Sequence, residues 1–262
     1  MSGALLTTRA GINSDILVLS LSNPGFRNAL HPDMYAAGVE VLSTASHSPG
    51  TRAIVLRGAD QFFCAGGNLN RLQANRQLDS SVQHESIELL GSWVEALVSC
   101  PKPVIASVEG AAAGAGLALA LACDMVVAAS NAKFVAAHVK TALTPDGGGS
   151  WFASRLLPKN LAFEMLMLGD VFTAERLYQL GVVNHITAAG AADAAAIALA
   201  QRLAAGPQGA QGRIKRLLSA AVHTDLATHL VLERELFVDS LYSADCGEGI
   251  DAFLAKRTAQ FA

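Results

Sequence analysis

The sequence predicts an α/β fold whose last third is almost entirely helical. Segments typical of buried strands alternate with segments of helical periodicity through the first two-thirds of the chain, which favours a sheet covered by helices. From Thr173 onward the pattern is nearly all helical. The 262 residues are enough for one large core, alone or with an appendage, and no repeat of fixed period is present.

The strand segments are short aliphatic runs bounded by turn residues. The run from Ile16 to Ser22 ends at Asn23-Pro24-Gly25, which is a strong turn signal. A shorter apolar piece, Phe62 to Gly67, ends in a glycine turn, and Val182 to Ile186 is an extended piece within the helical third. The predicted strands are Ile16 to Ser22, Arg52 to Gly58, Val104 to Val108 and Met125 to Ala129.

The helices have recognisable starts and stops. His31-Pro32-Asp33 begins a helix whose apolar positions continue to Leu42. A long amphipathic helix, Ser81 to Cys100, is ended by Pro101-Lys102-Pro103, and Gly114 to Cys123 is a buried helix. The C-terminal helices are Ala191 to Ala205, Gln208 to Ala221, Asp225 to Leu241 and Gly247 to Lys256. Breaks near Gly190 and at Gly206-Pro207 suggest a core that carries the site over residues 1–190 and a helical oligomerisation region over residues 191–262.

The composition bounds the possible partners. The chain is 52% hydrophobic but only 16% charged, and we expect part of its surface to be hidden in an oligomer. The net charge is −3 without a basic run, which excludes nucleic acid and anionic membranes as expected partners. The N-terminus lacks the pattern of a signal peptide, so the expected location is the cytoplasm.

The cysteines and histidines give no sign of a metal site. The four cysteines form no C-x-x-C pair, which favours a reducing compartment and argues against disulfides or zinc. The seven histidines are scattered, and no H-E-x-x-H motif is present. The uncharged stretch from Gly110 to Cys123 is too short to cross a bilayer.

Two glycine-rich turns suggest close approach of the backbone to a ligand. In Val104 to Met125 a strand passes through a Gly/Ala turn into the buried helix, where N–H groups at the helix N-terminus could bind developing negative charge. The second turn lies in Phe63 to Leu69 (FCAGGNL). Gly114-Ala115-Gly116 begins a dinucleotide fingerprint, but Leu119 replaces its next small residue and the ribose-binding acid is missing. Tight helix–sheet packing is the other interpretation of this turn.

Asp146 is the most suggestive acidic residue. It lies in TPDGGGSW, where Pro-Asp-Gly is also a strong turn signal, so a turn-forming aspartate is the alternative to a catalytic acid. Glu85, Glu88 and Glu95 are expected on a solvated helix face. Asp124, at the start of a strand, is expected to be a structural carboxylate.

Taken together, these stretches resemble the enoyl-CoA hydratase/isomerase (crotonase) superfamily over almost the whole chain. The resemblance implies a spiral of ββα units with a helical C-terminal region that builds trimers, often paired into hexamers. It implies an acyl-CoA thioester as substrate, with no cofactor beyond that coenzyme A. The further matching residues are Asn28-Ala29-Leu30, Pro103 to Ala106, Cys123-Asp124, Leu168-Gly169-Asp170, Ala174-Glu175 and Gly181 to Val183.

The resemblance also implies roles for single residues. The N–H groups of Gly67 and Ala115 would form an oxyanion hole, and alanine in place of the family's usual glycine at 115 keeps the donor. The two glutamates of the family's hydratases are matched here by Ala118 and His138, so both are missing. Asp146 takes the position of the acid in the family's isomerases. PDGGGSW most resembles the isomerase group of phenylacetate degradation that acts on epoxyphenylacetyl-CoA (oxepin-CoA).

The remaining candidates would bind the substrate. By resemblance, Arg27, Phe253 and Lys256 would contact the CoA nucleotide, and the last two could do so for a neighbouring subunit. The alternative is that these are plain surface or interface residues. His138 is either part of the site or an ordinary hydrogen-bonded residue of the core or rim. The other substrate-binding candidates are Ala29, Ala65, Gly66, Asn68 and Leu69.

Two other functions stay open at this point. A hydratase would have to handle water with Asp146 and His138. A catalytically inactive scaffold that binds acyl-CoA or RNA is the other, although the lack of a basic patch argues against RNA and the retained Asp146 argues against an inactive site.

Overall fold

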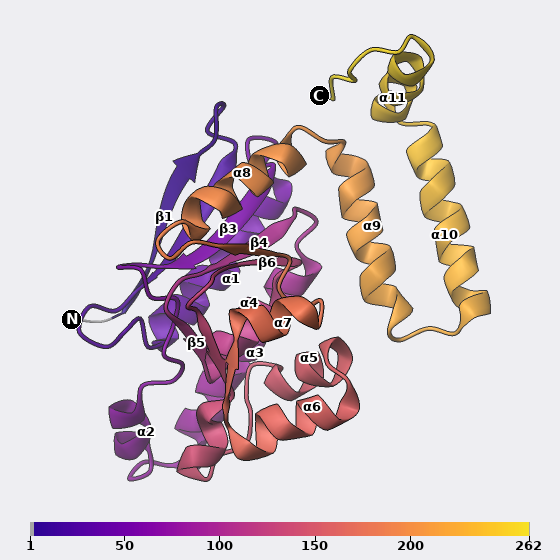
Figure 1. Cartoon of the computed structure of the whole chain (residues 1–262). Coiled ribbons are helices and arrows are strands. Elements are labelled where there is room, and N and C mark those ends of the chain that lie inside the picture. The colour runs from indigo at the N-terminus through magenta and orange to yellow at the C-terminus, as the bar shows by residue number, and fades with distance from the viewer. Residues whose placement is uncertain (1–2, 262) are drawn as a thin grey trace.

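The computed structural model describes residues 3–261 and has the predicted α/β architecture (Figure 1). Its main sheet has the strand order β1-β2-β3-β4-β6-β9, in which only β1 is antiparallel to its neighbour. These strands are β1 (Ala4–Ala10), β2 (Ile16–Ser22), β3 (Ala53–Gly58), β4 (Val104–Val108), β6 (Met125–Ala129) and β9 (His185–Thr187). A second sheet has the order β5-β7-β8 and consists of β5 (Ala111–Ala113), β7 (Lys133–Val135) and β8 (Val171–Thr173).

The predicted strands of the first half are confirmed, and the differences have local causes. The sequence analysis did not predict β1, because most of its side chains are exposed and give no apolar run. The extended piece predicted at Val182 begins as a strand only at His185. Val182 and Val183 are buried in the core instead, and the Asn184 side-chain oxygen accepts a hydrogen bond from Val126 N at 2.7 Å just before the pairing starts.

Helices cover both faces of the main sheet. One face packs against α1 (Pro32–His47), α3 (Ser80–Ser99) and α4 (Ala115–Ala122) in a large apolar core. The other face is covered by α8 (Ala192–Ala204), whose small residues Ala192, Ala196 and Ala200 recur every four positions and let the helix lie close to the strands. The buried carboxylate of Glu109 accepts hydrogen bonds from Gly190 N at 3.0 Å and Ala192 N at 2.9 Å, which fixes the start of α8.

Several short helical segments lie between the longer elements. Those between residues 137 and 168 escaped the sequence analysis because segments of five to eight residues carry too few apolar positions to show a period. The short segments are α2 (Leu69–Asn75), the 3₁₀ helix η1 (Ala137–Thr141), α5 (Gly149–Leu156), α6 (Lys159–Phe163), the π helix η2 (Glu164–Leu168) and α7 (Ala174–Gln179).

The last three helices project from the body of the molecule (Figure 1). They are α9 (Gln208–Ala221), α10 (Leu226–Leu241) and α11 (Ala244–Leu254). The last begins three residues before the predicted Gly247, because the Ser243 hydroxyl caps it by accepting from Cys246 N at 3.2 Å. Large apolar side chains on these helices are exposed in the single chain, among them Leu226 (74%), Phe237 (69%) and Leu254 (74%).

An ion pair joins the projecting helices to the sheet. Lys215 Nζ on α9 lies 2.8 Å from Asp124 Oδ2, which also accepts a hydrogen bond from Val104 N at 2.8 Å. Burial raises the pKa of Asp124, and Lys215 opposes that shift. The structural role predicted for Asp124 is therefore confirmed. The division at residues 190 and 191 stays a prediction, and α8, the first helix beyond it, packs on the sheet whereas α9 to α11 leave it.

The structure adds three findings on chemistry outside the site. Cys64, Cys100 and Cys123 are buried, Cys246 is half-buried, and all four carry free thiols. None of the helices within residues 3–261 is both long and apolar enough to cross a membrane. The same residues contain no group of three or more His, Cys, Asp or Glu side chains placed to hold a metal ion.

Candidate active site

The two glycine turns lie side by side. Cys64 N donates to the Ala111 carbonyl and Ala113 N donates to the Cys64 carbonyl, both at 2.9 Å, so the first turn pairs with β5 in parallel. A β-carbon on Gly66 would lie only 2.6 Å from Ala113 O and 3.3 Å from Gly114 Cα. Gly66 also has a φ of +88°, which side-chain-bearing residues rarely adopt. Glycine is therefore required for this approach of the two backbones.

Two backbone donors follow the paired glycines. Neither Gly67 N–H nor Ala115 N–H donates to a protein acceptor within residues 3–261. Ala115 is only 1% exposed, and buried backbone N–H groups are rarely left without a partner. Ala115 is also the first residue of α4, where the helix dipole favours negative charge. The pair of N–H groups can therefore bind an oxygen on which negative charge develops.

The turn that carries Asp146 packs against the start of α4. A β-carbon on Gly147 would lie 3.3 Å from Ala118 Cβ, and Ala118 is in the first turn of that helix. The N-cap of α5 is Gly148, so the Asp146 carboxylate caps no helix. Only the Asp146 carbonyl takes part in the turn, by accepting from Gly149 N at 2.9 Å. The carboxylate is thus available for another role.

The hydrogen-bond partner of the carboxylate is a histidine. Asp146 Oδ1 lies 3.0 Å from His138 Nε2, with side chains that are 26% and 12% exposed. Because an ionised carboxylate only accepts, His138 Nε2–H must donate to it. A β-carbon on Gly114 would lie 3.6 Å from the same Nε2, which places the pair beside the turn that leads to Ala115. No protein group within residues 3–261 bonds Asp146 Oδ2, which leaves that oxygen available to a ligand.

Two neighbours of this site carry buried groups with raised pKa values. Burial raises the pKa of the Cys64 thiol to about 12, and Asp146 adds to the shift, so Cys64 is not a thiolate nucleophile near neutral pH. Burial likewise raises the pKa of Tyr35 to about 12, opposed by Arg71 and reinforced by Asp146. The sequence analysis missed Tyr35 and Arg71, because they lie on α1 and α2 in unremarkable amphipathic contexts.

Several of the other candidates lie near the first turn. Ala65 N donates to the Arg27 carbonyl at 3.0 Å, and the exposed Arg27 guanidinium lies 5.9 Å from the centre of the Phe62 ring. Ala29 is buried beside them, at 5% exposure. The Asn68 side chain caps α2 by accepting from the N–H groups of the next turn, and Leu69 is 59% exposed.

Phe253 and Lys256 lie elsewhere in the chain. Both are exposed at the end of α11, far from α2 and β5 (Figure 1). Within one chain they therefore do not meet Arg27, and a role in binding the same ligand would require a neighbouring subunit.

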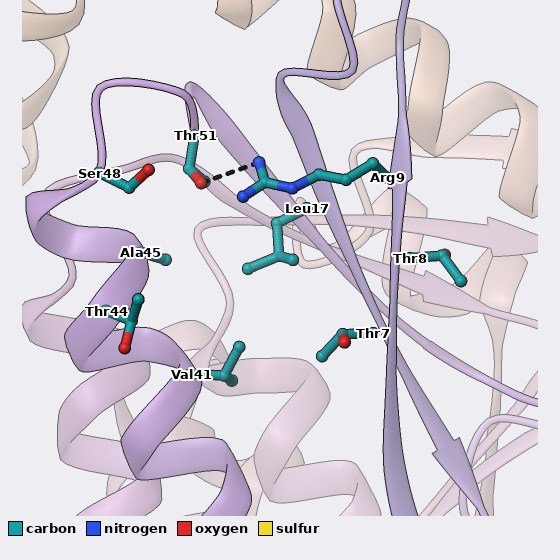
Figure 2. Close-up of a pocket in the computed structure, with 9 residues that line it drawn as sticks. All are labelled: Thr7, Thr8, Arg9, Leu17, Val41, Thr44, Ala45, Ser48 and Thr51. Carbon is teal, nitrogen blue, oxygen red and sulfur yellow. Dashed lines mark hydrogen bonds between the residues drawn. The ribbon is translucent and has the colours of Figure 1, made fainter.

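A separate cavity of about 260 Å³ lies between β1 and α1 (Figure 2). The Arg9 side chain in it already donates to Gly50 O and Thr51 Oγ1, both at 2.9 Å. None of the candidate site residues lines this cavity, which is therefore not the site described above.

Known proteins and solved structures resemble this chain over nearly its whole length. Residues 11–262 match the family model for enoyl-CoA hydratase/isomerase. The chain is 36% identical over 251 residues to the 1,2-epoxyphenylacetyl-CoA isomerase of Escherichia coli (strain K12), covering 95% of this chain and 96% of that one. It is also 36% identical, over 97% of both chains, to a probable enoyl-CoA hydratase of Rhodobacter capsulatus. The crystal structure of an enoyl-CoA hydratase from Polaromonas sp. JS666 superposes with a TM-score of 0.97 at 50% identity, covering 99% of this chain and 100% of that one.

The donor role of Gly67 can be tested with a matched pair of variants. Gly67→Pro removes the N–H, and turnover of an acyl-CoA substrate should fall by about a hundredfold to a thousandfold, about 2.7–4 kcal/mol. Gly67→Ala keeps the N–H, and its β-carbon would meet only Leu72 Cδ1 at 3.7 Å, so this control should stay near native activity. A folded Gly67→Pro protein with unchanged turnover would show that Gly67 is only a turn residue.

Proposed function

The chain belongs to the enoyl-CoA hydratase/isomerase family, and we propose that it is an acyl-CoA isomerase that moves a carbon–carbon double bond. The substrate is a CoA thioester, and the coenzyme A enters as part of it. In the proposed complex the thioester oxygen accepts hydrogen bonds from Gly67 N–H and Ala115 N–H. These donors stabilise the negative charge that reaches this oxygen when a proton leaves the neighbouring carbon.

Asp146 is the proposed proton shuttle. Its Oδ2 takes a proton from C2 of a 3-enoyl thioester, and the electrons of the broken C–H bond form an enolate. The same oxygen then returns the proton to C4, so that the double bond moves to C2 and nothing is added or lost. His138 holds Oδ1 at 3.0 Å and thereby directs Oδ2 to the substrate. A single carboxylate is sufficient because the enolate stays in place between the two steps.

The observation that carries this proposal is the convergence of three positions. Ala118 Cβ faces the turn of Asp146, and His138 Nε2 contacts the Asp146 carboxylate. By resemblance, the positions of Ala118 and His138 hold the glutamates that activate water in hydratases. Because this chain has alanine and histidine at these two positions, Asp146 supplies the carboxylate among residues 118, 138 and 146. A single carboxylate supports proton transfer within the substrate over addition of water.

A hydratase is the second candidate. The His138–Asp146 pair joins two polar groups that could hold a water molecule, and the relatives from Rhodobacter capsulatus and Polaromonas are named enoyl-CoA hydratases.

The Escherichia coli relative is by name an isomerase of 1,2-epoxyphenylacetyl-CoA, and together with the PDGGGSW match it supports a role in phenylacetate degradation. An assay of crotonyl-CoA hydration beside 3-enoyl-CoA isomerisation separates the two candidates.

The proposal includes a homotrimer, alone or paired into a hexamer. The projecting helices α9 to α11 expose large apolar side chains that a neighbouring subunit would cover. A neighbour would also bring Phe253 and Lys256 to the CoA nucleotide held near Arg27. The free thiols fit a reducing compartment, and we place the protein in the cytoplasm on that basis.

Asp146→Asn tests the proton shuttle. The amide keeps the shape of the side chain but cannot take up a proton at neutral pH, so isomerisation should fall by about a hundredfold to ten-thousandfold. Affinity for a CoA ligand and melting temperature should barely change. Glu88→Gln removes an exposed charge on α3 and serves as the control.

Ala118→Glu should not improve isomerisation, although it introduces a hydratase-like carboxylate. Near-native isomerase activity of Asp146→Asn would contradict the proposal.

Light scattering of the purified protein tests the assembly. The expected mass is a multiple of three subunits, since the exposed apolar faces of α9 to α11 are too extensive for a stable single chain. A monomer that persists at micromolar concentration would refute the proposed trimer.

A further inference from the structure

Arg71 lies beside the candidate active site, and none of the described residues gives it an acidic partner. It is the third residue of α2, which begins just after Gly67, and its backbone N–H donates to the Asn68 cap at 3.3 Å. Its Nη1 donates to Ser86 Oγ at 3.0 Å. Within residues 3–261 the guanidinium makes no ion pair, the Tyr35 hydroxyl is its other hydrogen-bonding neighbour, and its Nε is buried without a partner. Most of its donors are therefore unused.

The position of Ser86 places this guanidinium near Asp146. Ser86 and Leu90 are buried one helical turn apart on the same face of α3, which corresponds to about 5.4 Å along the helix. A β-carbon on Gly147 would lie 3.3 Å from Leu90 Cδ2, so this face of α3 packs against the turn of Asp146. Arg71 thus reaches α3 about one turn from Leu90, the residue that contacts the turn of Asp146.

Tyr35 joins Arg71 at the same place. It is 2% exposed, and its ring centre lies 6.3 Å from that of Trp93, on the same side of α3. The pKa of its hydroxyl is raised first by burial, lowered by Arg71 and raised again by Asp146, so the hydroxyl lies within the electrostatic range of both. Because the phenol is neutral near pH 7, it does not neutralise Arg71 but can donate or accept a further hydrogen bond.

Other half-buried arginines have protein acceptors: Arg52 donates to the carbonyls of Ala204 and Gly206, whereas two more are paired with acids. Arg57 lies 2.8 Å from Asp193, and Arg176 lies 2.8 Å from Glu164. A partly buried guanidinium without such a partner is unfavourable, and its planar set of donors fits carboxylate oxygens especially well. The missing partner of Arg71 is accordingly expected to come from a ligand.

We propose that Arg71, together with Tyr35, binds an oxygen atom of the acyl group at a distance from the thioester. The substrate class is then acyl-CoA thioesters whose acyl group carries a remote oxygen, as a carboxylate or as a neutral hydroxyl or ether, in preference to plain hydrocarbon chains. This inference rests on the proposed function for the placement of the thioester at Gly67 and Ala115.

Binding of three saturated thioesters of equal chain length tests the inference. Hexanoyl-CoA, 6-hydroxyhexanoyl-CoA and adipyl-CoA differ only at the carbon farthest from the thioester, and calorimetry gives the affinity of each. The native protein should bind at least one oxygen-bearing thioester about tenfold or more tightly than hexanoyl-CoA. The stronger of the two oxygen-bearing ligands identifies an anionic or a neutral acyl oxygen. Equal or tighter binding of hexanoyl-CoA would overturn the inference.

Two variants assign the preference to Arg71. Arg71→Met keeps a side chain of similar length and should abolish the preference while leaving the affinity for hexanoyl-CoA unchanged. Ser86→Ala keeps the guanidinium but removes the Ser86 Oγ that holds Nη1, so it should reduce the preference only in part. Arg76→Met, which removes an exposed charge at the end of the same helix, is the control and should change nothing. A preference that survives Arg71→Met would refute the role of Arg71.

The outcome is separable from that of the proposed function. The saturated thioesters do not react, so their affinities do not depend on whether the enzyme isomerises or hydrates. A protein that hydrates crotonyl-CoA and isomerises nothing would contradict the isomerase proposal and leave the ligand preference intact.

Discussion

The close approach of two backbones at Gly66 and Gly114 is the constraint on which the site depends. No side chain fits between them, since a β-carbon on Gly66 would lie 2.6 Å from the Ala113 carbonyl oxygen. The parallel pairing of Cys64 with β5 holds the two turns in register. It leaves the N–H groups of Gly67 and Ala115 without acceptors in the described part of the chain. The fold therefore builds two oriented donors before any substrate arrives, which is the condition for strong stabilisation of an oxyanion.

The groups around these donors determine which reaction they can serve. The Asp146 turn packs against Ala118, and its carboxylate is held by His138 at one oxygen only. Arg71 on α2 donates to Ser86 on α3, and its buried Nε has no acceptor within residues 3–261. In the proposed complex, one side of the site would bind the thioester, a second would move a proton, and a third would bind an oxygen of the acyl group. The donors and the Asp146 turn meet at the start of α4, whereas Arg71 contacts α3 at Ser86.

The sequence predicted the long elements well and the short ones poorly. The strands from Ile16, Val104 and Met125 and the helix Gln208–Ala221 have the predicted bounds, because each contains enough apolar residues to show its period. The three-residue strands of the second sheet contain too few. At the site, the glycine turns and Asp146 were visible locally, whereas their roles came from family resemblance. The His138–Asp146 contact and the position of Arg71 depend on how distant segments pack, which no local pattern reports.

The most direct test of the central claim is the fate of the proton during turnover. The purified protein is incubated with 3-hexenoyl-CoA in D₂O, and the product is analysed by mass spectrometry and NMR. If Asp146 carries the proton from C2 to C4, the product is 2-hexenoyl-CoA, and part of it contains no deuterium because the same proton has been returned. A protein that leaves 3-hexenoyl-CoA unchanged but adds water to 2-hexenoyl-CoA would contradict the account.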